Sequence, residues 1–144
     1  MAAKQYDMEL EIYRNIWKAL HDLCKCLDYI CDFQHPTVAE PTEYLRRLEE
    51  HSIDFKRKLE IFENQMDSVA PFYQCDIYEL LCKIDEECKK LMEIFQVSMG
   101  YTGMTNENTI IVNSEIIPQI CFLKEKLTKD IRDYLFSLQK IPDI

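Results

Sequence analysis

The chain has 144 residues, a formal net charge of −9 and a hydrophobic content of 47%. This length fits a single domain (residues 1–144), and the hydrophobic content is sufficient for a packed core, which excludes a disordered tail. Only two glycines occur, which argues against a β fold with many tight turns. The acidic charge disfavours general binding to nucleic acid or to anionic membranes, because phosphate groups would be repelled.

The first predicted element is a helix over residues 3–33. Its apolar residues recur at alternating spacings of three and four, which is typical of a helix packed on a partner helix. This stripe consists of Leu10, Tyr13, Trp17, Leu20, Cys24, Leu27 and Cys31. A second apolar row one position earlier widens the stripe, so we expect this helix to contact two neighbours and to bury Trp17. Pro36 and Pro41 mark the connection that follows, because proline interrupts a helix.

Two further helices are predicted over residues 42–68 and 72–99, with the same heptad spacing. The second stripe consists of Leu45, Leu48, Ser52, Phe55, Leu59, Phe62, Met66 and Val69. The third consists of Ile77, Leu81, Ile84, Cys88, Leu91, Phe95 and Ser98. We expect Phe55, Leu59 and Ile84 to be buried.

The ends of these two helices have recognisable signals. Pro41 is tolerated in a first turn, and Glu43 is placed to pair with Arg47 one turn later. Ala70-Pro71 ends the second helix or bends it sharply. Two starts stay open for the third helix: Asp76 as an N-cap in a capping-box-like sequence, or an earlier start at Phe72.

The segment from Gly100 to Asn113 is predicted to be a long connection. It holds both glycines, a polar run over residues 105–108 and a β-branched stretch over residues 109–112. A connection this long in a compact domain is typically functional or mobile. We expect its apolar end to pack over the bundle or to form a short strand. The residues predicted to bind a partner protein are Thr105, Asn106, Glu107, Asn108, Ile110, Ile111 and Val112.

A last helix is predicted over residues 116–139, with Pro118 in its first turn and Leu127 buried in its stripe. Together these elements predict an all-α fold: an elongated antiparallel four-helix bundle with coiled-coil packing. One long connection joins its third and fourth helices. No apolar run approaches the ~20 residues of a membrane-spanning helix. The first residues also lack the apolar region of a signal peptide, so we expect a cytoplasmic protein that makes no membrane contact.

The seven cysteines are interpreted as thiols, because an odd number without a signal peptide argues against a disulfide framework. A thiol on an apolar stripe acts as a small buried hydrophobe, which we expect for Cys24, Cys31 and Cys88. Cys24 and Cys31 lie about 10 Å apart along a helix, too far for one zinc ion. The chain has no Cys-x-x-Cys, and none of its histidines completes a Glu-x-x-His pair. We therefore expect no metal and no cofactor.

One six-residue stretch carries a catalytic pattern. In Arg46-Arg47-Leu48-Glu49-Glu50-His51, an arginine precedes a histidine by five positions. This resembles the signature of the HEPN superfamily, whose all-α dimers include metal-independent ribonucleases. The resemblance implies that Arg46 stabilises the phosphate and that His51 acts as acid or base. The family usually has a small polar residue after the arginine, where this chain has Arg47.

A broader resemblance covers residues 9–95. The runs from Glu11 to Leu20 and from Val69 to Glu79 resemble long-helix domains of uncharacterised bacterial proteins, and this implies a helical module with no attached activity. The leading hypothesis is a non-enzymatic protein–protein interaction module: a subunit, adaptor or inhibitor. The alternative is a HEPN-like ribonuclease or its inactive relative. We expect the interaction module to bind a protein partner and not nucleic acid. The sequence leaves open whether the chain forms a homo-oligomer.

Overall fold

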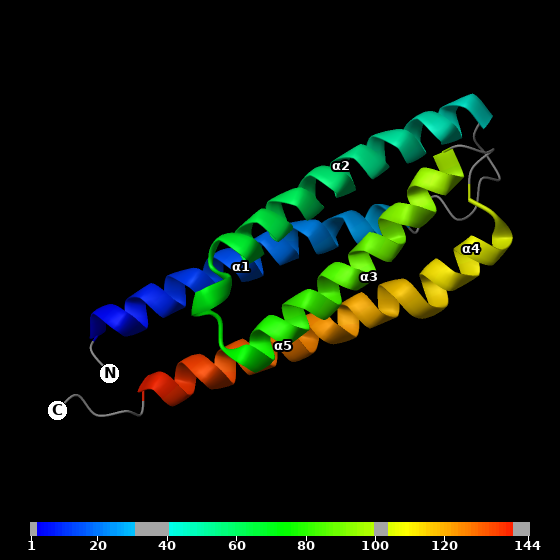
Figure 1. Cartoon of the computed structure of the whole chain (residues 1–144). Helices are drawn as coiled ribbons and strands as arrows, with labels where there is room; N and C mark the ends of the chain where they lie inside the picture. Colours follow the sequence, from blue (N-terminus) through cyan, green and yellow to red (C-terminus); the bar gives the residue numbers. More distant parts are fainter. Residues whose placement is uncertain (1–2, 31–40, 100–103, 140–144) are drawn as a thin grey trace.

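The computed structural model describes residues 3–30, 41–99 and 104–139, and these ranges are almost entirely helical. Figure 1 shows four long helices in one elongated bundle. The elements are α1 (Ala3–Ile30), α2 (Pro41–Ser68), α3 (Cys75–Met99), α4 (Asn106–Ile111) and α5 (Ile117–Gln139). The predicted all-α four-helix fold is confirmed. No helix in the described ranges is long and apolar enough to cross a membrane.

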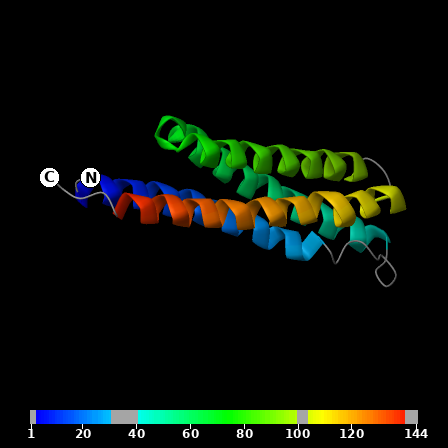
Figure 2. The same cartoon turned by 90° about the horizontal axis from the view of Figure 1, so that it is seen from below.

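Each long helix packs against the next one in the chain, and α5 packs against both α3 and α1, which closes the ring of four. Neighbours run in opposite directions, so both termini lie at the same end of the bundle (Figures 1 and 2). The predicted stripes meet inside this ring. Phe55 and Phe95 are fully buried and contact each other edge to face, with 6.0 Å between ring centroids. Leu59, Ile84 and Leu127 are buried, as predicted.

Two serines lie within the apolar stripes and are buried without a polar partner from another helix. Each donates its hydroxyl to the carbonyl four residues earlier: Ser52 to Leu48 and Ser98 to Ile94, both at 2.7 Å. A buried hydroxyl that is satisfied within its own helix costs little. Both serines can therefore occupy heptad positions without interrupting the core.

The bounds of the first two helices agree with the prediction as far as the described residues extend. Helix α1 begins at Ala3, and its predicted end at residue 33 lies outside the described residues, as does Cys31. Helix α2 covers Pro41–Ser68 and carries the expected ion pair, with 2.9 Å between Arg47 Nη2 and Glu43 Oε1.

Helix α3 begins at Cys75, so neither predicted start is correct. A 3₁₀ turn over Ala70–Phe72 lies within the connection between α2 and α3. Gln74 then takes the capping role, because its side-chain Oε1 accepts a hydrogen bond from the backbone N–H of Ile77 at 3.1 Å. Asp76 lies one position inside the helix. The sequence favoured aspartate as a cap, but the backbone of Gln74 is held in place by another helix, as discussed below.

The expected long connection is shorter than predicted, because the chain is helical again from Asn106. Helix α4, a π-helical segment over Val112–Ile116 and α5 follow one another without a break (Figure 1). Of the two alternatives for Ile110 to Val112, the short strand is therefore wrong, while Val112 packs into the core of the bundle. Helix α5 begins at Ile117, one residue after the predicted start, and Pro118 lies in its first turn as predicted, but the π-helical segment precedes it without a break. Proline lacks the N–H of a regular helix and its ring crowds the carbonyl four residues earlier, and the wider π turn relieves that conflict.

Candidate functional site between α1 and α5

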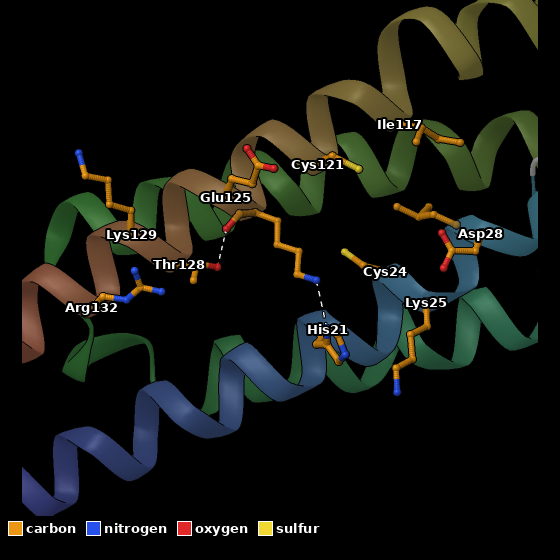
Figure 3. Close-up of a pocket in the computed structure, with 12 residues that line it drawn as sticks. His21, Cys24, Lys25, Asp28, Ile117, Cys121, Glu125, Thr128, Lys129 and Arg132 are labelled. Carbon is orange, nitrogen blue, oxygen red and sulfur yellow. Dashed lines mark hydrogen bonds between the residues drawn. The ribbon is translucent and has the colours of Figure 1, made fainter.

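A pocket of about 500 Å³ opens between α1 and α5 (Figure 3). This volume is within the usual range of ligand-binding clefts. The pocket lies where the two helices pack side by side, and its walls come from their facing rows of side chains. Cys24 and Asp28 contribute from α1, while Cys121, Glu125 and Thr128 contribute from α5.

His21, which lines this pocket, is stacked on Trp17. The rings of Trp17 and His21 are nearly parallel, with 4.9 Å between centroids. Trp17 donates its indole N–H to the hydroxyl of Thr128 at 2.9 Å, and that hydroxyl donates to the carbonyl of Lys124 at 2.8 Å. Trp17 is only partly buried, so the prediction that it lies in the core is wrong. It occupies the edge of the α1 stripe, where polar side chains of α5 cover it in place of apolar ones.

Lys124 lies above this aromatic pair. Its ammonium nitrogen is 5.5 Å from the centre of the Trp17 ring and 3.1 Å from Nδ1 of His21. An ammonium group can only donate, so Nδ1 is the acceptor in this contact. The positive charge of Lys124 is thus held against the aromatic face of Trp17 and the ring nitrogen of His21. Neither contact neutralises it.

The charge of the pocket is opposite to that of the chain as a whole. Four cations line it, against the two carboxylates of Asp28 and Glu125. These cations are Lys25, Lys124, Lys129 and Arg132. Among the described residues, none of the four forms an ion pair, whereas Arg46, Arg47 and Arg57 of α2 all pair with carboxylates of their own helix. The pocket therefore has an excess of positive charge, four cations against two carboxylates, and none of the four cations is within ion-pair distance of a carboxylate among the described residues.

A smaller apolar pocket of about 280 Å³ adjoins this site along the same two helices and shares Thr128 and Arg132 with it. Trp17 lines its floor together with Leu10 and Leu135. The two pockets form one continuous surface, which we call the α1–α5 face. One part of that surface is cationic, and the other is apolar.

The thiol on the wall of the larger pocket is not an activated nucleophile. Burial raises the pKa of Cys24 to about 11, and this outweighs the opposing effect of nearby Lys124. A nucleophilic cysteine needs a lowered pKa. Within residues 3–30, 41–99 and 104–139, no group of three or more His, Cys, Asp or Glu side chains could hold a metal ion.

The predicted partner-binding residues lie at the other end of the molecule from the chain termini, in and around α4. Thr105 is the N-cap of α4, and its hydroxyl accepts the N–H of Asn108 at 3.1 Å. Ile110 is 64% exposed, whereas Val112 is fully buried. Thr105, Asn106, Glu107 and Ile110 are exposed, while Asn108 and Ile111 are partly buried. The structure thus brings most of this set to the surface and turns Val112 into the core.

The predicted catalytic pair does not form a shared site within one chain. Arg46 Nη1 lies 2.6 Å from Glu50 Oε1 on the same helix, so its charge is already paired. Residues five apart on a helix point about 140° away from each other. A pocket of about 600 Å³ includes Arg46 and Met99 in its lining but does not include His51.

Sequence reasoning missed Lys124, Thr128 and Arg132 as site residues. A signal was present: Cys121, Lys124, Thr128 and Arg132 repeat at spacings of three, four and four, one position beyond the apolar stripe of the last helix. Such a row is usually a solvated flank. Only the placement of α1 beside α5 shows that this row borders a pocket. Comparisons with known protein families, with curated proteins and with solved structures found no match to this chain.

Proposed function

We propose that this chain is a non-enzymatic protein–protein interaction module, acting in the cytoplasm as a subunit, adaptor or inhibitor. The α1–α5 face is its main contact surface. The observation that carries the proposal is Trp17, which is only partly buried at the point where a cationic and an apolar pocket meet. Tryptophan and arginine are the residues that contribute most to binding energy at protein interfaces, and both lie on this face.

The distribution of chemistry supports binding over catalysis. The residues of the α1–α5 face include a thiol with a raised pKa, a histidine in contact with a lysine, and cations that form no ion pair among the described residues. A hydrolase or transferase needs a nucleophile next to a base, or a metal. A partner protein, by contrast, needs an exposed aromatic anchor with charged groups around it.

The segment around α4 is proposed as a second contact surface. Its exposed apolar residue, Ile110, lies on the long helix that also carries Phe122, which is 59% exposed. Apolar side chains this exposed on one helix are compatible with coverage by another protein. Val112 is left out of this surface because it is buried.

Affinity capture with matched variants tests the proposal. The full chain is used as bait in extracts of its native source, beside Trp17→Ala and Phe72→Ala, with circular dichroism to show that both variants fold. Phe72 is a matched control because it is an aromatic residue that is 60% exposed in the α2–α3 connection. We expect one stoichiometric partner with the wild type and with Phe72→Ala, and its loss with Trp17→Ala.

Two results contradict this proposal. One is the absence of any stoichiometric partner of the wild-type chain. The other is a partner that is retained by Trp17→Ala and also by Ile110→Ala, since neither proposed surface would then be used.

A further inference from the structure

We propose that the α1–α5 face binds an amphipathic helix of a partner protein that carries acidic residues beside its apolar row. This inference rests on the proposed interaction function and names the chemistry of the partner. The juxtaposition that carries it is an apolar floor with Trp17 at its centre, continuous with a set of cations that have no carboxylate partner.

The first step is the charge of the face. Lys124 is held against Trp17 and His21, and Figure 3 shows the side chain of Arg132 extending into the space between α1 and α5. Lys25 and Lys129 point away from that space on opposite sides. Two cations therefore lie within the groove and two lie at its rims. A carboxylate placed here would form ion pairs with Lys124 and Arg132, for which the described chain provides no carboxylate partner.

The second step is the length and shape of the face. Its lining on α1 extends from Leu10 to Asp28, which is about 27 Å at a rise of about 1.5 Å per residue. A partner helix of roughly 18 residues has the same length. A helix placed in an apolar groove uses residues at spacings of three and four as anchors. Acidic residues at its flanking positions would then face Lys124 and Arg132 in the groove.

The third step separates this occupant from other anions. A small anion such as phosphate would use the cationic pocket and leave the apolar floor beside Leu10 and Leu135 uncovered. A nucleic acid would bring a continuous row of phosphates toward a chain whose net charge is −9, and this opposes binding outside the groove. An amphipathic acidic helix matches both parts of the face.

A displayed peptide library tests the charge of the occupant directly. Each peptide has 18 residues, with Leu, Ile, Met or Phe at heptad positions and an equal mixture of Glu, Lys, Gln and Ala elsewhere. The baits are the wild-type chain, the double variant Lys124→Gln/Arg132→Gln and the control Lys126→Gln. Lys126 is exposed on the same helix and lies outside both pockets.

We expect Glu to be enriched over Lys at least threefold on the wild type and on Lys126→Gln, and this bias to disappear on the double variant. The net charge of the chain alone predicts the opposite, an enrichment of Lys. The selected peptide should also change the fluorescence of Trp17, the one tryptophan of the chain, in a saturable titration that weakens at least tenfold in the double variant.

Several outcomes overturn the inference: enrichment of Lys, no charge bias, no binding peptides, or equal binding of inorganic phosphate or single-stranded RNA at the same site. Light scattering that shows a dimer of the wild type, lost in the double variant, would instead make a second copy of the chain the occupant. A native partner lost with Trp17→Ala but lacking an acidic helix would leave the interaction function standing and reject only the acidic helix.

Discussion

The hydroxyl of Tyr13 in α1 accepts a hydrogen bond from the backbone N–H of Gln74, just before α3, at 2.9 Å. Tyr13 is fully buried, and its ring also contacts Tyr73 and Tyr134, at 5.8 and 5.5 Å between centroids. One side chain of the first helix thus fixes the point where the third begins. Gln74 in turn uses its own side chain to cap α3. The α2–α3 connection is therefore positioned from across the bundle.

Replacement of Tyr13 by Phe removes this hydrogen bond and leaves the ring in place. We expect a loss of about 1–2 kcal/mol in the free energy of unfolding, because the partly buried N–H of Gln74 then loses its acceptor. Urea denaturation measures it. Tyr6→Phe is the control, because the Tyr6 hydroxyl accepts a hydrogen bond from the Gln139 side chain at an exposed position. Loss of that exposed hydrogen bond should cost under about 0.5 kcal/mol. Equal losses in the two variants would contradict this role for Tyr13.

The cap of α4 gives a second prediction. The Thr105 hydroxyl accepts the N–H of Asn108 at 3.1 Å, and loss of such a cap costs about 1 kcal/mol. We expect Thr105→Ala to speed hydrogen exchange of the amides over residues 107–111, while α1 is unchanged. Thr105→Ser keeps the oxygen and should exchange like the wild type. Unchanged exchange in Thr105→Ala would show that packing alone holds α4.

Heptad spacing was sufficient to predict the four long helices, because each buries one apolar stripe and this is a local property of the sequence. Helix α2 was predicted within one residue for this reason. The region around Pro118 was predicted less well. A proline favours a helix start, but in the structure a π turn over Val112–Ile116 comes just before Pro118 and joins α5 to the preceding helix. Such a π turn has no sequence signature of its own.

The candidate site could be predicted far less well than the fold. Trp17 was placed in the core because it follows the apolar spacing, but a stripe does not reveal which of its edges meets a polar neighbour. Lys124 is 107 positions later in the chain, and its contact with Trp17 depends on α5 closing the ring beside α1. Such long-range pairing follows from topology and not from local spacing.

The pH dependence of stability should reflect a charged cluster between α2 and α3. Lys89 Nζ lies 3.1 Å from Oδ2 of buried Asp85 and 3.5 Å from Oε2 of Glu63. Burial raises the pKa of Glu63, and nearby Asp85 raises it further against the opposing effect of Lys89. The folded state therefore binds this proton more tightly than the unfolded state. The contribution of Glu63 to stability falls as the pH rises from the ordinary carboxyl range through the raised pKa.

Glu63→Gln imitates the protonated form and removes this penalty. We expect the free energies of unfolding of the variant and the wild type to differ least in acid. As the pH approaches neutrality, the variant should become more stable relative to the wild type. Urea denaturation at several pH values measures the difference. Glu60→Gln, an exposed change on the same helix, should give a pH curve parallel to that of the wild type. A parallel curve for Glu63→Gln would reject the raised pKa.

The thiols should react in an order set by burial. Burial raises the pKa of both Cys24 and Cys26 to about 11. The Cys26 thiol also donates a hydrogen bond to Oδ2 of Asp54 at 3.4 Å, and this contact contributes to the raised pKa of Cys26. At pH 8 only about one in a thousand such thiols is ionised. We expect iodoacetamide to label both at least tenfold more slowly than exposed Cys75, as followed by peptide mass spectrometry. Comparable rates for Cys24 and Cys75 would mean that the larger pocket exposes its thiol.

The last prediction separates binding from catalysis. We expect the purified chain not to cleave labelled single-stranded RNA or tRNA, under conditions in which a pancreatic-type ribonuclease does. Arg46→Ala and His51→Ala should leave that result and the capture of a partner unchanged. The reason is electrostatic: the Arg46 guanidinium lies 2.6 Å from Glu50 and 3.9 Å from Glu43, so a phosphate would have to displace a carboxylate that is already bound. Cleavage by the wild type that both substitutions abolish would establish a composite site, built between two chains, and would replace the interaction module with the enzyme.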